Sequence, residues 1–141
     1  MAIEIKIHPL DFEPDVAIGV DLPMMTPAGS GFQQTYTTLD QAVANAKNLL
    51  YTNKGERIMQ PDFGCDLHRM LFENITEDLL LLVEDTIRSS FNYWLPYIFI
   101  NELTITGDPD RNSVFITMKI SLEGNKFDTR SIQVEVINNV I

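Results

Sequence analysis

Cysteine and basic residues are scarce in this chain, and long apolar runs are missing. The single cysteine, Cys65, excludes an internal disulfide and therefore the disulfide-stabilised class of small secreted protein. Ten Lys and Arg against twenty Asp and Glu give a formal net charge of -10. That charge repels nucleic-acid phosphates and anionic lipid headgroups, and no apolar run approaches the roughly 20 residues of a spanning helix. We therefore predict no nucleic-acid partner and no membrane association.

The N-terminal sequence also lacks a secretory signal. Met1 to His8 alternates apolar and polar residues instead of placing a charged segment before an apolar block. We therefore expect synthesis and assembly in a cytoplasm.

Residues that would bind a cofactor or a metal are equally few. Neither G-x-G-x-x-G nor G-x-x-x-x-G-K-[ST] occurs, so no phosphate-binding loop is predicted. Cys65 and His68 lie three residues apart, but a zinc site needs about four ligands and the only other histidine is His8. A Cys/His nucleophilic pair lacks an evident third group to orient it. We predict no cofactor, no metal and no small-molecule substrate.

Carboxylates are abundant in the central part of the chain and raise one enzymatic alternative. Glycoside hydrolysis needs only two carboxylates at a suitable separation. A polyanionic protein is repelled by an anionic cell wall, however, and acidic residues at a helix start have a structural explanation. We therefore predict that the protein is not an enzyme, with a lysozyme-like cell-wall hydrolase as the alternative. The residues concerned are Asp62, Asp66, Glu73, Glu77 and Glu84.

Turn-forming residues are concentrated in the first third of the sequence. Four prolines and three glycines precede Phe32 and exclude long regular elements, although Ile3 to Ile7 alternates as a short strand does. The whole chain is 45% hydrophobic and 21% charged, which is typical of an ordinary globular domain. We predict an extended N-terminal arm over residues 1–37 and a single domain over residues 38–141.

Capping signals and apolar residues at helical spacing predict two helices. Thr38 and Gln41 form a T-x-x-Q capping box at the start of the first helix, and Gly55 is well placed to end it. Thr76 caps the second helix, which runs to about Trp94 because a proline follows two residues later.

The second helix carries more apolar surface than one core requires. Val83, Ile87 and Phe91 form one apolar seam, whereas Leu81 and Leu82 lie partly off it. Two interpretations stay open: the domain covers this helix on both sides, or a second face docks another chain.

After Pro96 the apolar period changes from helical to alternating. Three runs alternate apolar and polar side chains as half-buried strands do, and turn-forming sequences separate them. The sequence therefore predicts an α+β fold, with two main helices packed on a three-stranded antiparallel sheet. The alternating runs lie at 103–106, 114–122 and 132–136.

One stretch, N-L-L-Y-T-N-K-G-E-R-I-M-Q-P-D-F-G-C-D-L-H-R-M-L-F at residues 48–72, resembles the baseplate wedge family typified by the gene 25 product of T-even phages. The family pattern is a helix ending in two leucines, a Gly-x-Arg turn, a Pro-x-Phe-Gly hinge and a Leu-Phe pair. The matching positions are Leu49, Leu50, Gly55, Arg57, Pro61, Phe63, Gly64, Leu71 and Phe72.

This resemblance implies a structural subunit in the tail baseplate of a virion, assembled in the host cytoplasm. Its partners would be other baseplate wedge subunits, whose core bundle it would hold, and the tail sheath protein. The sheath contact would form by strand addition to the last strand, which contains Val134 and Val136. A type VI secretion baseplate subunit is the alternative within the wider family.

One tripeptide departs from the family pattern. Leu95-Pro96-Tyr97 stands where the family usually has Glu-Pro-Arg. Trp94 and Tyr97 would then supply an aromatic contact to a partner or would belong to the core, and both interpretations stay open.

Two motif side chains have predicted contacts. Arg57 is expected to make a structural charge-assisted bond to Asp62 or Asp66. Phe72 is expected to lie either in the core or at an interface. The loss of folding stability on its replacement by alanine would distinguish these two positions.

Overall fold

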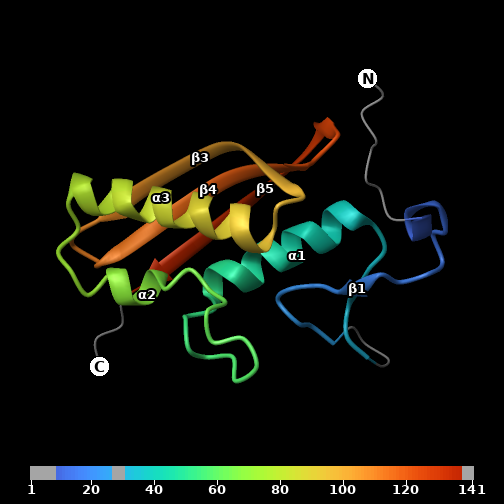
Figure 1. Ribbon diagram of the computed structural model, residues 1–141, viewed down its shortest axis with the longest axis horizontal. Helices are drawn as coiled ribbons and strands as arrows, with labels where there is room; N and C mark the ends of the chain where they lie inside the picture. Colours follow the sequence, from blue (N-terminus) through green and yellow to red (C-terminus); the bar gives the residue numbers. More distant parts are fainter. Residues whose placement is uncertain (1–8, 27–30, 138–141) are drawn as a thin grey trace.

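The computed structural model describes residues 9–26 and 31–137, and Figure 1 shows their arrangement. The predicted strand at Ile3 to Ile7 lies outside the described residues. The elements, in chain order, are the 3-10 helix η1 (Pro9–Phe12), β1 (Gly19–Val20), β2 (Gln34–Thr35), α1 (Thr38–Tyr51), α2 (Leu67–Met70), α3 (Glu77–Trp94), β3 (Ile98–Asp108), β4 (Ser113–Leu122) and β5 (Asn125–Ile137).

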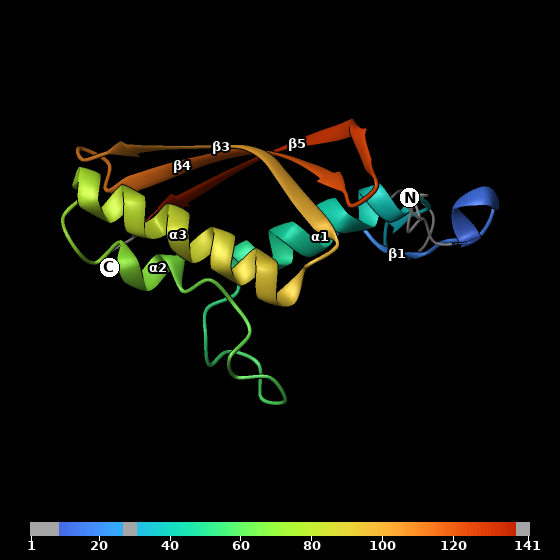
Figure 2. The same cartoon turned by 45° about the horizontal axis from the view of Figure 1, so that its top comes forward.

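A three-stranded antiparallel sheet of order β3-β4-β5 forms one layer of the molecule. The helices α1, α2 and α3 lie together on one face of this sheet (Figure 2). Alternate residues of the strands, among them Ile116 and Met118 of β4 and Val134 of β5, are buried against the helices. The predicted α+β architecture of two main helices on three strands is therefore confirmed.

Both long helices begin at a threonine cap. The Thr76 side chain accepts a hydrogen bond from the Leu79 N–H at the start of α3, as predicted. At α1 the prediction was wrong by one residue, because Thr37 rather than Thr38 is the cap and accepts from the Asp40 N–H. Threonine is a suitable cap at either position, and the Thr38 hydroxyl donates instead to the Asp11 carboxylate.

The first helix ends before the glycine expected to stop it. α1 ends at Tyr51, and the Thr52 hydroxyl donates to the Asn48 carbonyl oxygen at 2.6 Å. Gly55 instead lies in the following loop with a φ of +92°.

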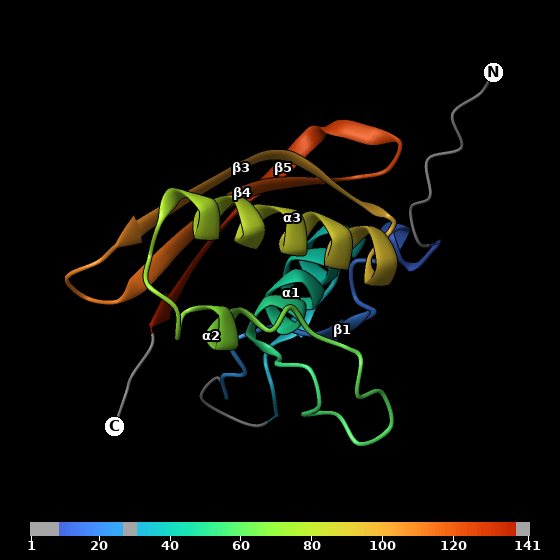
Figure 3. The ribbon, with the colours of Figure 1, turned by 60° about the vertical axis from the view of Figure 1, so that its left-hand side comes forward.

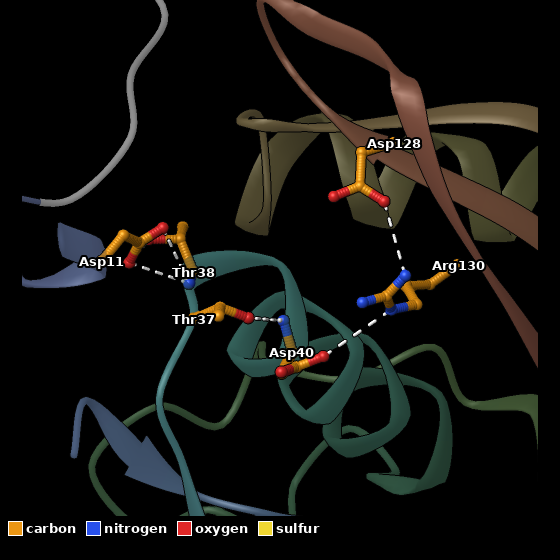
Figure 4. A network of polar contacts seen from close by, with 6 residues as sticks. All are labelled: Asp11, Thr37, Thr38, Asp40, Asp128 and Arg130. Carbon is orange, nitrogen blue, oxygen red and sulfur yellow. Dashed lines mark hydrogen bonds and ion pairs between the residues drawn. The ribbon is translucent and has the colours of Figure 1, made fainter. Parts of the chain in front are cut away.

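The segment before α1 is attached to the domain at several points. β1 pairs antiparallel with β2, and the Lys47 ammonium of α1 donates to the Leu22 carbonyl oxygen at 3.0 Å. The Asp11 carboxylate accepts hydrogen bonds from the backbone N–H and the hydroxyl of Thr38 (Figure 4). The described part of this segment therefore packs on α1, and the division at residues 37 and 38 stays a prediction.

An ion-pair network joins β5 to the same end of α1. Arg130 lies 3.6 Å from the Asp40 carboxylate and 3.4 Å from that of Asp128 (Figure 4). All three side chains are about half exposed, so solvent screening limits each pair to about 1 kcal/mol or less.

Candidate protein interaction surfaces

The loop between α1 and α2 contains most of the motif residues, and its own backbone fixes its shape. The Gly55 N–H donates to the Pro61 carbonyl oxygen at 2.7 Å, which closes the loop on itself. The Cys65 N–H donates to the Thr52 carbonyl oxygen at 3.2 Å, directly beside Gly64. Gly64 has a φ of +129°, and a Cβ there would overlap the same carbonyl oxygen. These motif glycines and the proline therefore shape the loop.

Two aromatic rings attach this loop to α3. The Phe63 side chain is buried and meets the Trp94 ring edge-on, with 5.1 Å between the ring centroids. The Arg57 guanidinium lies over the Phe63 ring, with its carbon 3.9 Å from the ring centroid. Arg57 therefore makes a cation–π contact that shields Phe63.

The charge-assisted bond predicted for Arg57 is not formed among the described residues, so that prediction was wrong. Asp66 pairs with Arg69 at 3.8 Å, and Asp62 is exposed. The physical reason is that the Phe63 ring offers the guanidinium a contact within the loop itself.

Several large apolar side chains are exposed near the motif. Leu71 is buried, whereas its neighbour Phe72 is 71% exposed. Ile58 and Met59 are 96% and 92% exposed in the loop that projects away from the sheet in Figure 2. Sequence reasoning gave no specific role to Ile58 and Met59, because apolar residues in an ordered loop are equally compatible with the core. Adjacent exposed apolar side chains such as Ile58 and Met59 are typical of protein interaction sites.

The Leu95-Pro96-Tyr97 corner belongs partly to the core. Leu95 is buried, and the half-buried Tyr97 accepts a hydrogen bond at its hydroxyl from the Asn45 side-chain amide at 2.7 Å. Trp94 is half-buried and packs against the core, whereas Pro96 is exposed. The core interpretation therefore accounts for Trp94 and Tyr97.

A groove of about 400 Å³ lies between the motif loop and the second half of α3. Tyr93 is 75% exposed there and meets Trp94 edge-on at 4.9 Å between centroids. The groove offers charged, hydroxyl and aromatic groups to a partner side chain. Its lining residues are Lys54, Asp62, Gly64, Ser89, Ser90, Tyr93 and Trp94.

Each outer strand of the sheet has one register shift against β4, and the regular stretch that remains is longer in β5. β3 has a register shift against β4 between Ile100 and Glu102. β5 pairs with β4 without interruption from Thr129 to Ile137. Val134 and Val136 are buried on the helix side of β5, so this edge would meet a partner through its backbone.

The groups considered for chemistry are spread out or already paired. Glu84 pairs with Arg88 at 2.9 Å, and Glu77 lies in the first turn of α3.

Among residues 9–26 and 31–137, no group of three or more His, Cys, Asp and Glu could hold a metal ion. No helix in the same ranges is long and apolar enough to cross a membrane.

Cys65 is fully buried, as expected of a small core residue, and burial raises the pKa of its thiol from 9.0 to about 11. The folded state therefore holds the thiol proton more tightly than the unfolded chain. Stability should be unaffected by this group below pH 9 and should fall above it, by about 1.4 kcal/mol per pH unit at most. Urea denaturation of the wild type and of Cys65→Ala between pH 8 and pH 11 measures this. An equal pH dependence in both proteins would contradict the assignment.

Comparison with known proteins identifies the family. The sequence model of the family described as "Baseplate wedge protein gp25" matches residues 38–126, more than half of the chain. The chain belongs to this family. The Baseplate wedge protein gp25 of Enterobacteria phage T4 is 29% identical over 91 residues, which is 64% of this chain and 69% of the T4 protein. Family membership makes this chain a structural component of a baseplate.

Two solved structures share the fold. A protein of Geobacter sulfurreducens, provisionally named tail lysozyme, matches with a TM-score of 0.60 and 22% identity over 69% of this chain and 87% of its own. A chain from the baseplate of the anti-feeding prophage matches with a TM-score of 0.55 and 21% identity over 86% of this chain and 85% of its own. At these identities the likeness concerns the α+β fold.

Proposed function

We propose that this gp25-family protein is a non-enzymatic adaptor of a contractile-tail baseplate wedge, carried in the virion and assembled in the host cytoplasm. It would bind other wedge subunits and join the inner baseplate to the first sheath ring by strand addition. The single observation that carries the sheath contact is the regular pairing of the edge strand β5 over residues 129–137.

The sheet favours β5 over β3 as the edge that accepts a strand. An added strand needs a regular row of backbone N–H and C=O groups, and a register shift interrupts such a row. β3 has its shift between Ile100 and Glu102 and is regular over residues 102–108, whereas β5 has its shift before Thr129 and is regular over the longer range 129–137. Ile132, Val134 and Val136 are buried beside this edge, so an incoming strand would extend an apolar layer.

Exposed apolar side chains of the motif region supply the contacts to other wedge subunits. Ile58 and Met59 extend from a loop that is closed by its own backbone hydrogen bonds, and Phe72 lies just before α3. A loop with a fixed shape loses little conformational entropy when it binds. The loop is therefore suited to insertion into an apolar site on a partner.

The carboxylates support a structural role over cell-wall hydrolysis. Glu84 and Asp66 are paired with arginines within one helical turn, and Glu77 stabilises the start of α3. Three of the five carboxylates considered for hydrolysis therefore have a structural role, and the two that do not are Asp62 and Glu73. Both exceptions are exposed.

Hydrogen exchange tests the strand addition directly. We expect amides of residues 129–137 to exchange faster in the free chain than in a complex with the sheath protein of the same particle, because added backbone hydrogen bonds protect them. The amides of β3 serve as the internal control and should keep their rates. Protection of β3 alone, or no protection at either edge, would rule out the proposed contact.

A further inference from the structure

The outward side of α3 carries an apolar pair that the described part of the chain leaves uncovered. Leu81 and Leu82 are 62% and 53% exposed, whereas Leu79 is buried against the core. Asp78 precedes and Asp85 follows this pair by three or four residues, which places all four side chains on one face of the helix. We call these four residues the α3 face. Figures 1 and 3 show α3 along the outside of the molecule.

The charge around the two leucines is negative and unneutralised. Glu77, Asp78 and Asp85 are exposed and have no ion pair or side-chain hydrogen bond within residues 9–26 and 31–137. The nearest basic side chain along the helix, Arg88, is engaged by Glu84 at 2.9 Å. The α3 face therefore combines an apolar centre with an acidic rim.

We propose that the α3 face docks an amphipathic helix of another baseplate subunit, whose leucine-like stripe is flanked by lysine or arginine. The proposal rests on the adaptor role above and names the chemistry of one partner. A helix is favoured over a strand because the backbone groups within α3 are already bonded internally, so only side-chain packing is available. Basic flanks complement Glu77, Asp78 and Asp85, and the net charge of -10 disfavours an anionic membrane at this face.

The test uses two synthetic helical peptides with the same leucine stripe, one flanked by lysines and one by glutamates. Calorimetric titration of the full chain should show at least about tenfold tighter binding of the lysine peptide. Asp78→Lys with Asp85→Lys should invert this preference. Asp110→Lys with Glu123→Lys is the matched control, because it changes the net charge equally at exposed positions outside α3.

The apolar part of the α3 face has its own test. Leu81→Ser with Leu82→Ser should weaken lysine-peptide binding at least about tenfold, because the stripe loses its apolar contact. The melting temperature should change little, since both side chains are exposed. An unchanged melting temperature would show that the variant is folded.

Three outcomes would overturn this proposal. In the first, the Asp110→Lys/Glu123→Lys control inverts the peptide preference as strongly as the α3 variant does. In the second, the Leu81→Ser/Leu82→Ser variant binds the lysine peptide as tightly as the wild type. In the third, the chain binds anionic phosphatidylserine vesicles more tightly than the lysine peptide. Protection of β5 by sheath protein together with failure here would reject only the α3 contact. Failure of both tests would reject the adaptor role.

Discussion

Replacing Gly64 by alanine is expected to lower the free energy of unfolding by about 3 kcal/mol or more, because two separate costs coincide at this residue. Its φ of +129° lies in a region that residues with a Cβ rarely adopt. The added methyl would also overlap the Thr52 carbonyl oxygen, which is held in place by the Cys65 N–H. Neither backbone segment can move without breaking this bond. Urea denaturation of Gly64→Ala against wild type measures the loss.

Gly55 provides the matched control for this prediction. Its φ of +92° is also positive, but a Cβ there would meet no atom within 4 Å. Gly55→Ala should therefore cost only the backbone strain of about 1 to 2 kcal/mol. Equal losses in the two variants would show that the contact with Thr52 contributes nothing.

Replacing Phe91 by alanine is expected to cost about 3 to 5 kcal/mol, the usual range for a fully buried phenylalanine. Phe91 is 2% exposed and lies on the buried side of α3 with Val83 and Ile87. Phe72→Ala should cost less than about 0.5 kcal/mol, because its ring is 71% exposed.

The same pair of variants separates folding from assembly. Thermal denaturation and a co-assembly assay with the other wedge subunits should show Phe72→Ala to be stable but defective in assembly. A loss of stability in Phe72→Ala close to that of Phe91→Ala would contradict the exposed position of Phe72. Normal assembly of Phe72→Ala would remove this residue from the interface.

Local patterns were sufficient for the existence of the two long helices and for the buried sides of β4 and β5. Alternation over residues 114–122 and 132–136 predicted two strands and the side of each that is buried, because a strand has a period of two. The helical spacing of Val83, Ile87 and Phe91 identified the seam of α3 in the same way. These features depend on neighbours within a few residues.

Features that depend on distant contacts were not predictable in this way. Leu71 and Phe72 are adjacent and apolar, and only the packing of α2 shows that the first is buried and the second exposed. Arg57 has carboxylates nearby in sequence, yet it lies on the Phe63 ring, whose position depends on Trp94 of α3. The exposure of the motif loop likewise depends on how the whole domain folds, and not on residues close to it in sequence.

The exposed apolar residues of the motif suggest that it serves binding as well as the shape of the loop. Gly55, Pro61 and Gly64 shape the loop, whereas Ile58 and Met59 gain nothing for the isolated domain by lying in solvent. Presentation of these apolar side chains to another subunit would explain why the loop has a fixed shape and an exposed apolar surface.

Cryo-electron microscopy of a contractile-tailed particle that contains this chain tests the adaptor role most directly. The account predicts density for the chain in the baseplate beneath the first sheath ring, with a sheath strand paired along residues 129–137 of β5. A particle that lacks the chain, or one in which the β5 edge has no added strand while the sheath contacts another surface, would contradict it.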